Sequence, residues 1–182
     1  MSAEVFTNFT RYPDAPAQLR LYLPLIENLQ GAPGVVSAAI TNAIPLSSLQ
    51  PGAIPFQIEG RVVDLDRRPT TDGRVVSPDY FKTLGIPLLQ GRAFAETDTA
   101  ETDRVIVINQ SMVRHWEGRD PLGSRISTDN GQTWATVVGV VADVKQFGLD
   151  RESVAQGLAA APEAFLGLLK GKNFGKQLVK LV

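Results

Sequence analysis

The chain has no cysteine among its 182 residues and a single histidine, His115. Disulfide bonds and thiolate metal sites are therefore excluded, and so is any metal centre that needs several histidines. The 18 Lys and Arg residues nearly balance the 19 Asp and Glu residues, and neither sign forms a long block. The charge pattern therefore lacks the footprint of a protein that binds nucleic acid or anionic lipid.

Long apolar runs are also missing. No window approaches the roughly 20 apolar residues that cross a bilayer. The N-terminal stretch MSAEVFTNFTRYPD has neither the basic start nor the apolar run of a signal peptide. As written, the sequence predicts a soluble chain, and its hydrophobic content of 43% indicates a packed core rather than disorder.

In the segment RVVSPDYFKTLGIPLLQGRAF, residues 74–94, the expected secondary structure changes three times. Its two valines end a strand, and Ser77 is placed to cap a short helix with its side chain. Gly85 suits the left-handed position that ends such a helix. Residues 86–89 then run apolar and extended, which predicts a return of the chain into the core.

Hydrophobic spacing elsewhere switches between the helical and the strand period. A helix capped by Asp14 is expected over residues 15–30, where Pro24 should kink or divide it. Residues 124–127 and 133–144 are expected to form a hairpin, because Asn-Gly at the turn supplies the positive φ that a tight turn needs. Further strands are expected at residues 4–10, 35–40, 55–61 and 104–108. The predicted fold class is α+β, with mixed sheets and short interspersed helices.

Two more helices are expected. Asn109 can cap the first, whose apolar face includes Trp116. The second is an appended C-terminal helix over residues 155–170, where the sequence becomes rich in Ala and Leu and where Gly171 provides a stop. A short apolar strand over residues 177–182 follows it.

Carboxylates gather in one loop, which makes it the first candidate for a metal site. They are Glu96, Asp98, Glu101 and Asp103. The loop lacks the glycine and the ligand spacing of an EF-hand, so a solvated acidic loop is favoured over a calcium site.

Other candidates for chemistry are equally weak. His115 reads as a partly exposed structural histidine, and Trp116 and Trp134 read as core or rim aromatics. The stretch VGVVAD, residues 138–143, lacks the third glycine and the following helix of a dinucleotide fingerprint. None of the serines Ser47, Ser48, Ser77 and Ser111 lies in a Gly-x-Ser-x-Gly context, so a nucleophilic triad has little support. The sequence therefore predicts a protein that is not an enzyme, with no catalytic, cofactor-binding or metal-binding residue and no cofactor.

An ordered set of phrases carries a family resemblance. It comprises RYPD, APGVVSAAITNAIPL, PFQIEGR, VVSPDYFKTLGIPLLQGRAF, RVIVINQSMVRHWEGRDPLGSRIS and WATVVGVVADVKQFGLDRES. In their order and spacing over residues 5–153 they strongly resemble the MacB-like periplasmic core domain of ABC transporter permeases, in the FtsX-like group.

The resemblance implies a non-catalytic domain on the extracytoplasmic, periplasmic face of the inner membrane. It implies a role in protein–protein docking and mechanical coupling, with the remaining permease and ATPase components and periplasmic partner proteins as partners. Nucleic acid is not among them. The resemblance connects the domain to the membrane only through flanking helices that this chain lacks.

The last residues, GLAAAPEAFLGLLKGKNFGKQLVKLV, resemble a different family, the NADPH-dependent medium-chain reductases. In such enzymes the Asn-Phe-Gly-Lys region, here residues 173–176, lies near the cofactor. The nucleotide-binding fold of those enzymes is missing here, so cofactor binding does not carry over. The resemblance suggests a fused or frame-joined gene with its junction near residues 152–154, and the alternative is chance imitation by an Ala/Leu-rich helix.

Two parts are therefore expected. Residues 1–153 form the periplasmic core domain, as one unit or as two subdomains, and residues 154–182 form an appended helix and strand. Deletion of residues 154–182 is expected to leave the remaining fold intact. Two other functions stay open, a fragment of an NADPH-dependent medium-chain oxidoreductase and a free-standing ligand-binding module with a deep apolar pocket.

Overall fold

The structure is a computed structural model, and it describes residues 2–5, 8, 10–46, 52–61, 63–99, 102–145, 156–160 and 176–181. Its helices are α1 (Ala15–Gln30), α2 (Tyr80–Leu84) and α3 (Gln110–Val113), with 3-10 turns η1 (Leu65–Arg67) and η2 (Arg114–Trp116). Its first six strands are β1 (Ser2–Glu4), β2 (Val35–Thr41), β3 (Ala53–Pro55), β4 (Gln57–Ile58), β5 (Thr70–Val76) and β6 (Leu88–Gly91). The others are β7 (Val105–Asn109), β8 (Arg125–Ser127), β9 (Ala135–Val141), β10 (Gln156–Ala160) and β11 (Lys176–Leu181).

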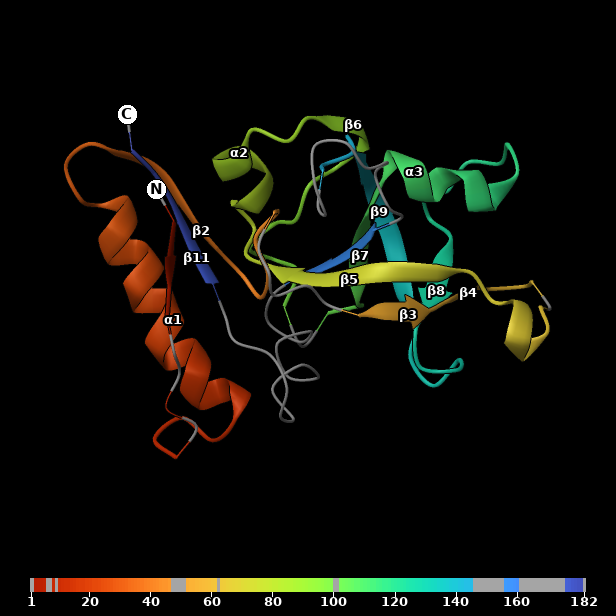
Figure 1. Cartoon of the computed structure of the whole chain (residues 1–182), viewed down its shortest axis with the longest axis horizontal. Coiled ribbons are helices and arrows are strands. Elements are labelled where there is room, and N and C mark those ends of the chain that lie inside the picture. Colours follow the sequence, from red (N-terminus) through yellow and green to blue (C-terminus); the bar gives the residue numbers. More distant parts are fainter. Residues whose placement is uncertain are drawn as a thin grey trace.

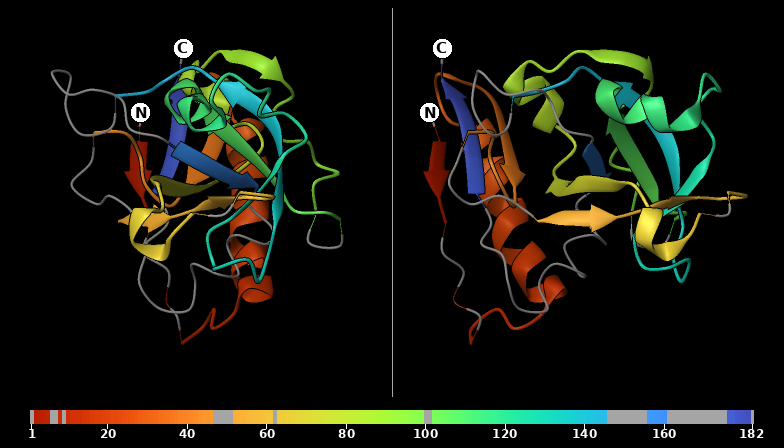
Figure 2. Two further views of the ribbon diagram at one scale, coloured as in Figure 1. Left: turned by 90° about the vertical axis from the view of Figure 1, so that its right-hand side faces the viewer. Right: turned by 45° about the vertical axis from the view of Figure 1, so that its right-hand side comes forward.

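The described strands form one mixed sheet. Its order is β1-β11-β2-β5-β10-β7-β9-β8-β4, while β3 pairs with β5 and β6 pairs with β9. β10 runs parallel to β5 and β7 runs parallel to β9, and the other pairings are antiparallel. In Figure 1, α1, β2 and β11 lie at one end of the molecule, and β8, β9 and α3 lie at the other, with β5 between them. Figure 2 shows β1 and β11 beside β2. The α+β class is confirmed.

The predicted start of α1 is confirmed, and its predicted break is not. The Asp14 carboxylate accepts a hydrogen bond from the backbone N–H of Ala17 at 2.8 Å, which satisfies one of the free donors at the start of the helix. Pro24 lies inside the helix, on an exposed face, and α1 continues past it to Gln30 as one element. The side chain of Tyr22 instead packs inward against Ile40 of β2.

Two predicted helix caps are corrected by the structure. Ser77 does not cap α2 with its side chain, because its hydroxyl accepts the backbone N–H of Ile40 in β2 at 3.0 Å. At α3 the side chain of Asn109 makes no capping bond, and the carboxylate of Asp143 accepts the N–H of Ser111 at 2.9 Å. In both cases the partner lies more than 30 residues away in the sequence, so local sequence gave no sign of it.

The expected return of residues 86–89 into the core is also corrected. The strand here is β6, at Leu88–Gly91, and all of its residues are exposed. It pairs with the end of β9, off the main path of the sheet. The hairpin of β8 and β9 is confirmed, with positive φ angles of 63° at Asn130 and 84° at Gly131 in its turn.

The helix expected over residues 155–170 is wrong at its start, because Gln156–Ala160 form β10 between β5 and β7. Pairing on both edges satisfies the backbone of these residues and outweighs their helical propensity. Residues 161–175 lie outside the described part of the chain. The expected terminal strand is confirmed as β11, which pairs with both β1 and β2.

Buried apolar side chains form three clusters. The largest fills the space around β7, β9 and α3 and comprises Phe56, Ile58, Ile106, Ile108, Met112, Trp116, Ile126, Val137 and Val140. The second surrounds α2 and comprises Ala39, Val76, Tyr80, Phe81, Phe94, Val107 and Val141. The third lies under α1 and comprises Tyr22, Ile40 and Val75.

Candidate functional site

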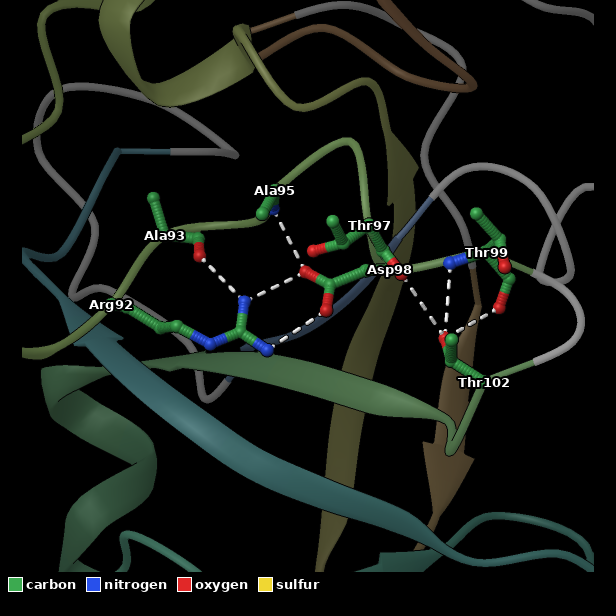
Figure 3. Close-up of polar contacts among 7 residues, drawn as sticks. All are labelled: Arg92, Ala93, Ala95, Thr97, Asp98, Thr99 and Thr102. Carbon is green, nitrogen blue, oxygen red and sulfur yellow. Dashed lines mark hydrogen bonds and ion pairs between the residues drawn. The ribbon is translucent and has the colours of Figure 1, made fainter.

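The acidic loop was the first candidate for a cation site in the sequence. In the structure its carboxylate Asp98 is bonded to nearby residues of the chain (Figure 3). The guanidinium of Arg92 donates to both carboxylate oxygens of Asp98, at 2.7 and 2.8 Å, and Ala95 N–H donates to the same carboxylate at 2.8 Å. The hydrogen bonds from Arg92 hold the pKa of Asp98 below its usual value, against the effect of burial. This carboxylate is fully engaged.

The rest of that loop also satisfies its own polar groups. The hydroxyl of Thr102 accepts the N–H of Thr99 at 3.0 Å and donates to the carbonyl of Thr99 at 2.9 Å. Glu96 and Asp103 are exposed, and Glu101 lies outside the described residues. Within the described ranges no group of three or more His, Asp or Glu side chains is placed to hold a metal ion.

His115 lies half-buried with its ring edge against Phe56, at 5.3 Å between ring centroids and an interplanar angle of 85°. Burial lowers its pKa, and the nearby charges of Arg114 and Arg61 lower it further. The guanidinium of Arg61 also donates to the backbone carbonyl of His115. These contacts give His115 a packing role in the turn that follows α3.

The candidate serines are not brought together. Ser77 holds β2, as described above, while the hydroxyl of Ser111 donates to Asp143 at 2.7 Å. Asn109 donates to the same carboxylate at 2.6 Å. Asp143 therefore ties the segment after β9 to the start of α3. Ser47 and Ser48 lie outside the described residues. Trp116 is in the core and donates through its indole N–H to Ser124 at 2.8 Å, and Trp134, half-buried, has the guanidinium of Arg125 over its ring.

A buried ion pair between Arg74 and Asp72 was missed by the sequence reasoning. Its N–O distance is 2.9 Å, and Arg74 also donates to the carbonyl of Ala43 at 2.7 Å. Burial raises the pKa of Asp72, with the charge of Arg74 opposing the shift, and burial raises the pKa of Tyr80 to about 12. Charges at positions i and i+2 of a strand share one face, and that spacing was the available signal.

An apolar groove lies beside this network, and we call it the β6 groove. It has a volume of about 410 Å³ and is lined by Pro45, Leu46, Leu84, Gly85, Ile86, Pro87, Asp143, Val144 and Lys145. Three chain segments that are far apart in sequence meet here. Its one acidic side chain, Asp143, already accepts hydrogen bonds from Asn109 and Ser111.

One exposed leucine lines the groove, and two more follow its lining residue Pro87 in the chain. Leu46 is 56% exposed, and Leu88 and Leu89 of the adjoining β6 are 43% and 45% exposed. The other large apolar side chains that are exposed in the described part of the chain are Leu23, Val36 and Val63. No described strand pairs with the outer edge of β6. The groove and the strand edge thus offer apolar contact together with backbone hydrogen-bonding groups.

Comparisons with known proteins agree on the architecture. The family described as the MacB-like periplasmic core domain matches residues 6–167. The periplasmic region of MacB from Actinobacillus actinomycetemcomitans superposes with a TM-score of 0.62 at 17% identity, over 87% of this chain and 64% of that one. The extracellular domain of the noncanonic ABC-type transporter YknZ from Gram-positive bacteria superposes with a TM-score of 0.56 at 14% identity, over 86% of this chain and 70% of that one. At these identities the likeness of the structures concerns the fold.

A short match points to a reductase. The chain is 55% identical over 31 residues to an NADPH-dependent curcumin reductase from Escherichia coli (strain K12). These residues are 17% of this chain and 9% of that protein.

Among the described residues, no helix is long and apolar enough to cross a membrane.

Proposed function

Since the chain belongs to the MacB-like periplasmic core domain family, we propose that it serves an ABC transporter permease by protein–protein docking and mechanical coupling, without catalysing a reaction itself. The family is extracytoplasmic, and the chain is the periplasmic core domain of a MacB- or FtsX-like permease. Its proposed partners are the remaining permease and ATPase components and periplasmic partner proteins.

The β6 groove is the observation that carries the docking role. Large apolar side chains that stay exposed in one place mark surfaces that contact another molecule. Leu46 in the lining meets this description, and so do Leu88 and Leu89, which directly follow the lining residue Pro87. The acidic side chain at its wall, Asp143, is occupied by internal hydrogen bonds, and apart from Lys145 the other lining residues are apolar or glycine, which favours apolar contact over chemistry at this surface.

The sheet supports the coupling role. β5 joins the end that carries α1 and β2 to the end that carries β8 and β9 (Figure 1). Arg74 of β5, paired with Asp72 on the same strand, donates to the carbonyl of Ala43 and so fastens β5 to the segment after β2. A displacement applied at one end therefore reaches the other through hydrogen-bonded, close-packed elements.

The docking role is tested in a reconstituted permease that carries this domain. Leu88→Lys and Leu89→Lys place charges beside the groove and are expected to lower the ATP hydrolysis that partner proteins stimulate. Leu23→Lys on α1 is the matched control, because Leu23 is 54% exposed and lies outside the groove lining. Equal loss in the control, or no loss in the two groove variants, would contradict docking at this surface.

The reductase match supports a second candidate, a fragment of an NADPH-dependent medium-chain oxidoreductase. The observation in its favour is the 31-residue identity, which covers 17% of the chain. A fluorescence titration with NADPH tests it, and we expect no saturable quenching or enhancement. Saturable binding in the micromolar range would overturn the non-enzymatic proposal. The free-standing ligand-binding module stays a prediction.

A further inference from the structure

The backbone contact between β2 and β5 is short and is concentrated at one point. The only register pair is Thr41 with Val76. It is flanked by two further backbone hydrogen bonds, from Asn42 N–H to the Val75 carbonyl at 3.2 Å and from Ser77 N–H to the Ile40 carbonyl at 2.9 Å. We call residues 40–43 and 74–77 the pivot.

Side chains reinforce the pivot strongly. Ser77 accepts the N–H of Ile40 at 3.0 Å, and the side-chain carbonyl of Asn42 accepts the N–H of Val75 at 3.0 Å. The buried guanidinium of Arg74 reaches from β5 to the carbonyl of the residue after Asn42, at 2.7 Å. Each of these bonds is buried, and breaking it would leave a polar group without a partner in the core.

Away from the pivot, two polar contacts join the unit of α1 and β2 to α2 and the turn before it. The hydroxyls of Ser37 in β2 and Thr83 in α2 share a hydrogen bond of 2.6 Å. The amide of Gln30, the last residue of α1, donates to the carboxylate of Asp79 at 2.7 Å. We call these two contacts the latch. Ser37 lies four residues before Thr41, which is about 13 Å along an extended strand.

Beside the latch, β2 packs against α2 through a small side chain. β2 contributes one residue, Ala39, to the apolar cluster around α2, while Tyr22 and Ile40 belong to the separate cluster under α1. Methyl side chains interdigitate less than branched or aromatic ones, so few steric contacts oppose a sliding motion here.

From this contrast we propose that α1 and β2, together with β11 and β1 on the far edge of β2, form a hinged unit that turns about the pivot and is held in the closed position by the latch. The polar bonds are concentrated at the pivot, whereas the latch end is held by two hydrogen bonds and by the packing of Ala39 against α2. The end with fewer polar bonds is expected to open first. The inference deepens the mechanical coupling proposed above and rests on it for its role in the transporter. The hinge names the part of the domain that moves.

The absence of cysteine makes the motion directly measurable, because introduced cysteines are the only sites for thiol-reactive spin labels. Labels at Asn28→Cys on α1 and Gln132→Cys in the β8–β9 turn report the distance between the two ends of the molecule, and both positions are exposed. The latch is removed by Gln30→Ala with Thr83→Val, and pulsed electron paramagnetic resonance gives the distance distribution. We expect a second distance population that the parent chain lacks.

The matched control is Gln90→Ala with Thr102→Val, which removes an exposed glutamine side chain of β6 and the hydroxyl that Thr102 bonds to Thr99, neither of them part of the latch. We expect its distance distribution to coincide with that of the parent chain. An unchanged distribution in the latch variant, or the same change in the control, would overturn the hinge.

A disulfide separates the hinge from its proposed role. Ser37→Cys with Thr83→Cys replaces two oxygens that are 2.6 Å apart and should close a bridge on mild oxidation. In the reconstituted permease we expect the oxidised form to lose partner-stimulated ATP hydrolysis and to regain it with reductant. A second distance population in the spin-label experiment, together with unchanged hydrolysis in the locked form, would support the hinge and contradict the coupling role.

Discussion

Gly139 and Gly91 let β9 and β6 approach more closely than any side chain would allow. A Cβ atom at Gly139 would lie 2.1 Å from the carbonyl oxygen of Arg92, and one at Gly91 would lie 2.3 Å from the carbonyl oxygen of Val138. The obstructing atoms are backbone, so a rotamer change cannot relieve the clash. The position of β6, and with it the rim of the β6 groove, depends on these two residues.

Gly139→Ala is therefore expected to lower the free energy of unfolding by about 1–3 kcal/mol, the usual cost of overpacking. Urea denaturation measures the change. Gly31→Ala serves as the control, because Gly31 has a φ of −79° and a Cβ there would have its nearest contact at 3.5 Å. Equal midpoints for the two variants would show that β6 can shift without cost.

His115 gives the domain a dependence on pH. Burial lowers its folded-state pKa below the usual value of 6.5, so the unfolded chain binds the proton more readily. The corresponding stability is present above the unfolded pKa and is lost as the pH falls toward the folded pKa.

We expect His115→Gln to lose less stability than the parent chain between about pH 7 and pH 5, the range in which a histidine changes charge. Urea midpoints across this range are measured for both chains. The difference between the two curves reports on His115, because the carboxylates titrate in both chains and cancel. Any packing lost against Phe56 shifts the whole curve and leaves its slope unchanged. Parallel curves for the two chains would contradict the burial effect.

At the scale of the element, α2 shows where local sequence was sufficient. Gly85 ends the helix at a φ of 67° and a ψ of 33°, in the left-handed region that the sequence predicted. Asp14 at α1 and Asn130-Gly131 in the hairpin turn were equally predictable, because their hydrogen bonds or angles involve neighbours in the chain. The roles of Ser77 and Asp143 were not, because their partners, Ile40 and Ser111, are distant in the sequence.

Gly85→Val tests the end of α2. A Cβ at this position would meet open space, so the expected loss of about 1–2 kcal/mol comes from backbone strain alone. Gly85→Asn is the matched variant, since asparagine tolerates the left-handed region, and it should retain most of the stability. Thermal melting compares the two, and equal melting temperatures would argue against the strain.

At the scale of the whole molecule, the class of the fold was predictable and its sheet order was not. The α+β class follows from strand and helix periods that can be read in short windows. The place of β10 between β5 and β7 depends on pairing across the molecule, and the Ala/Leu-rich sequence of that region favours a helix. The β6 groove likewise had no local signal, because segments near residues 46, 86 and 144 meet only in the folded chain.

Truncation after Ser153 tests whether the C-terminal residues are an appended part or an integral part of the sheet. The sequence predicted an appended part, whereas the structure pairs Gln156–Ala160 with two neighbours and Lys176–Leu181 with β2. Loss of these pairings should lower the melting temperature and broaden the unfolding transition. Calorimetry measures both quantities. A truncated chain that melts as sharply and at as high a temperature as the full chain would support the expected division into residues 1–153 and residues 154–182.

The position of β9 also bears on the synthesis of the chain. β6, β7 and β8 all pair with β9, and β9 is the last of these four strands in sequence. A nascent chain that has just passed residue 127 therefore exposes the apolar β7, residues VIVIN, without the parallel neighbour that later covers one edge. Until Val141 has emerged, β6, β7 and β8 lack the strand with which each of them pairs, so their unpaired edges stay open to non-native contacts.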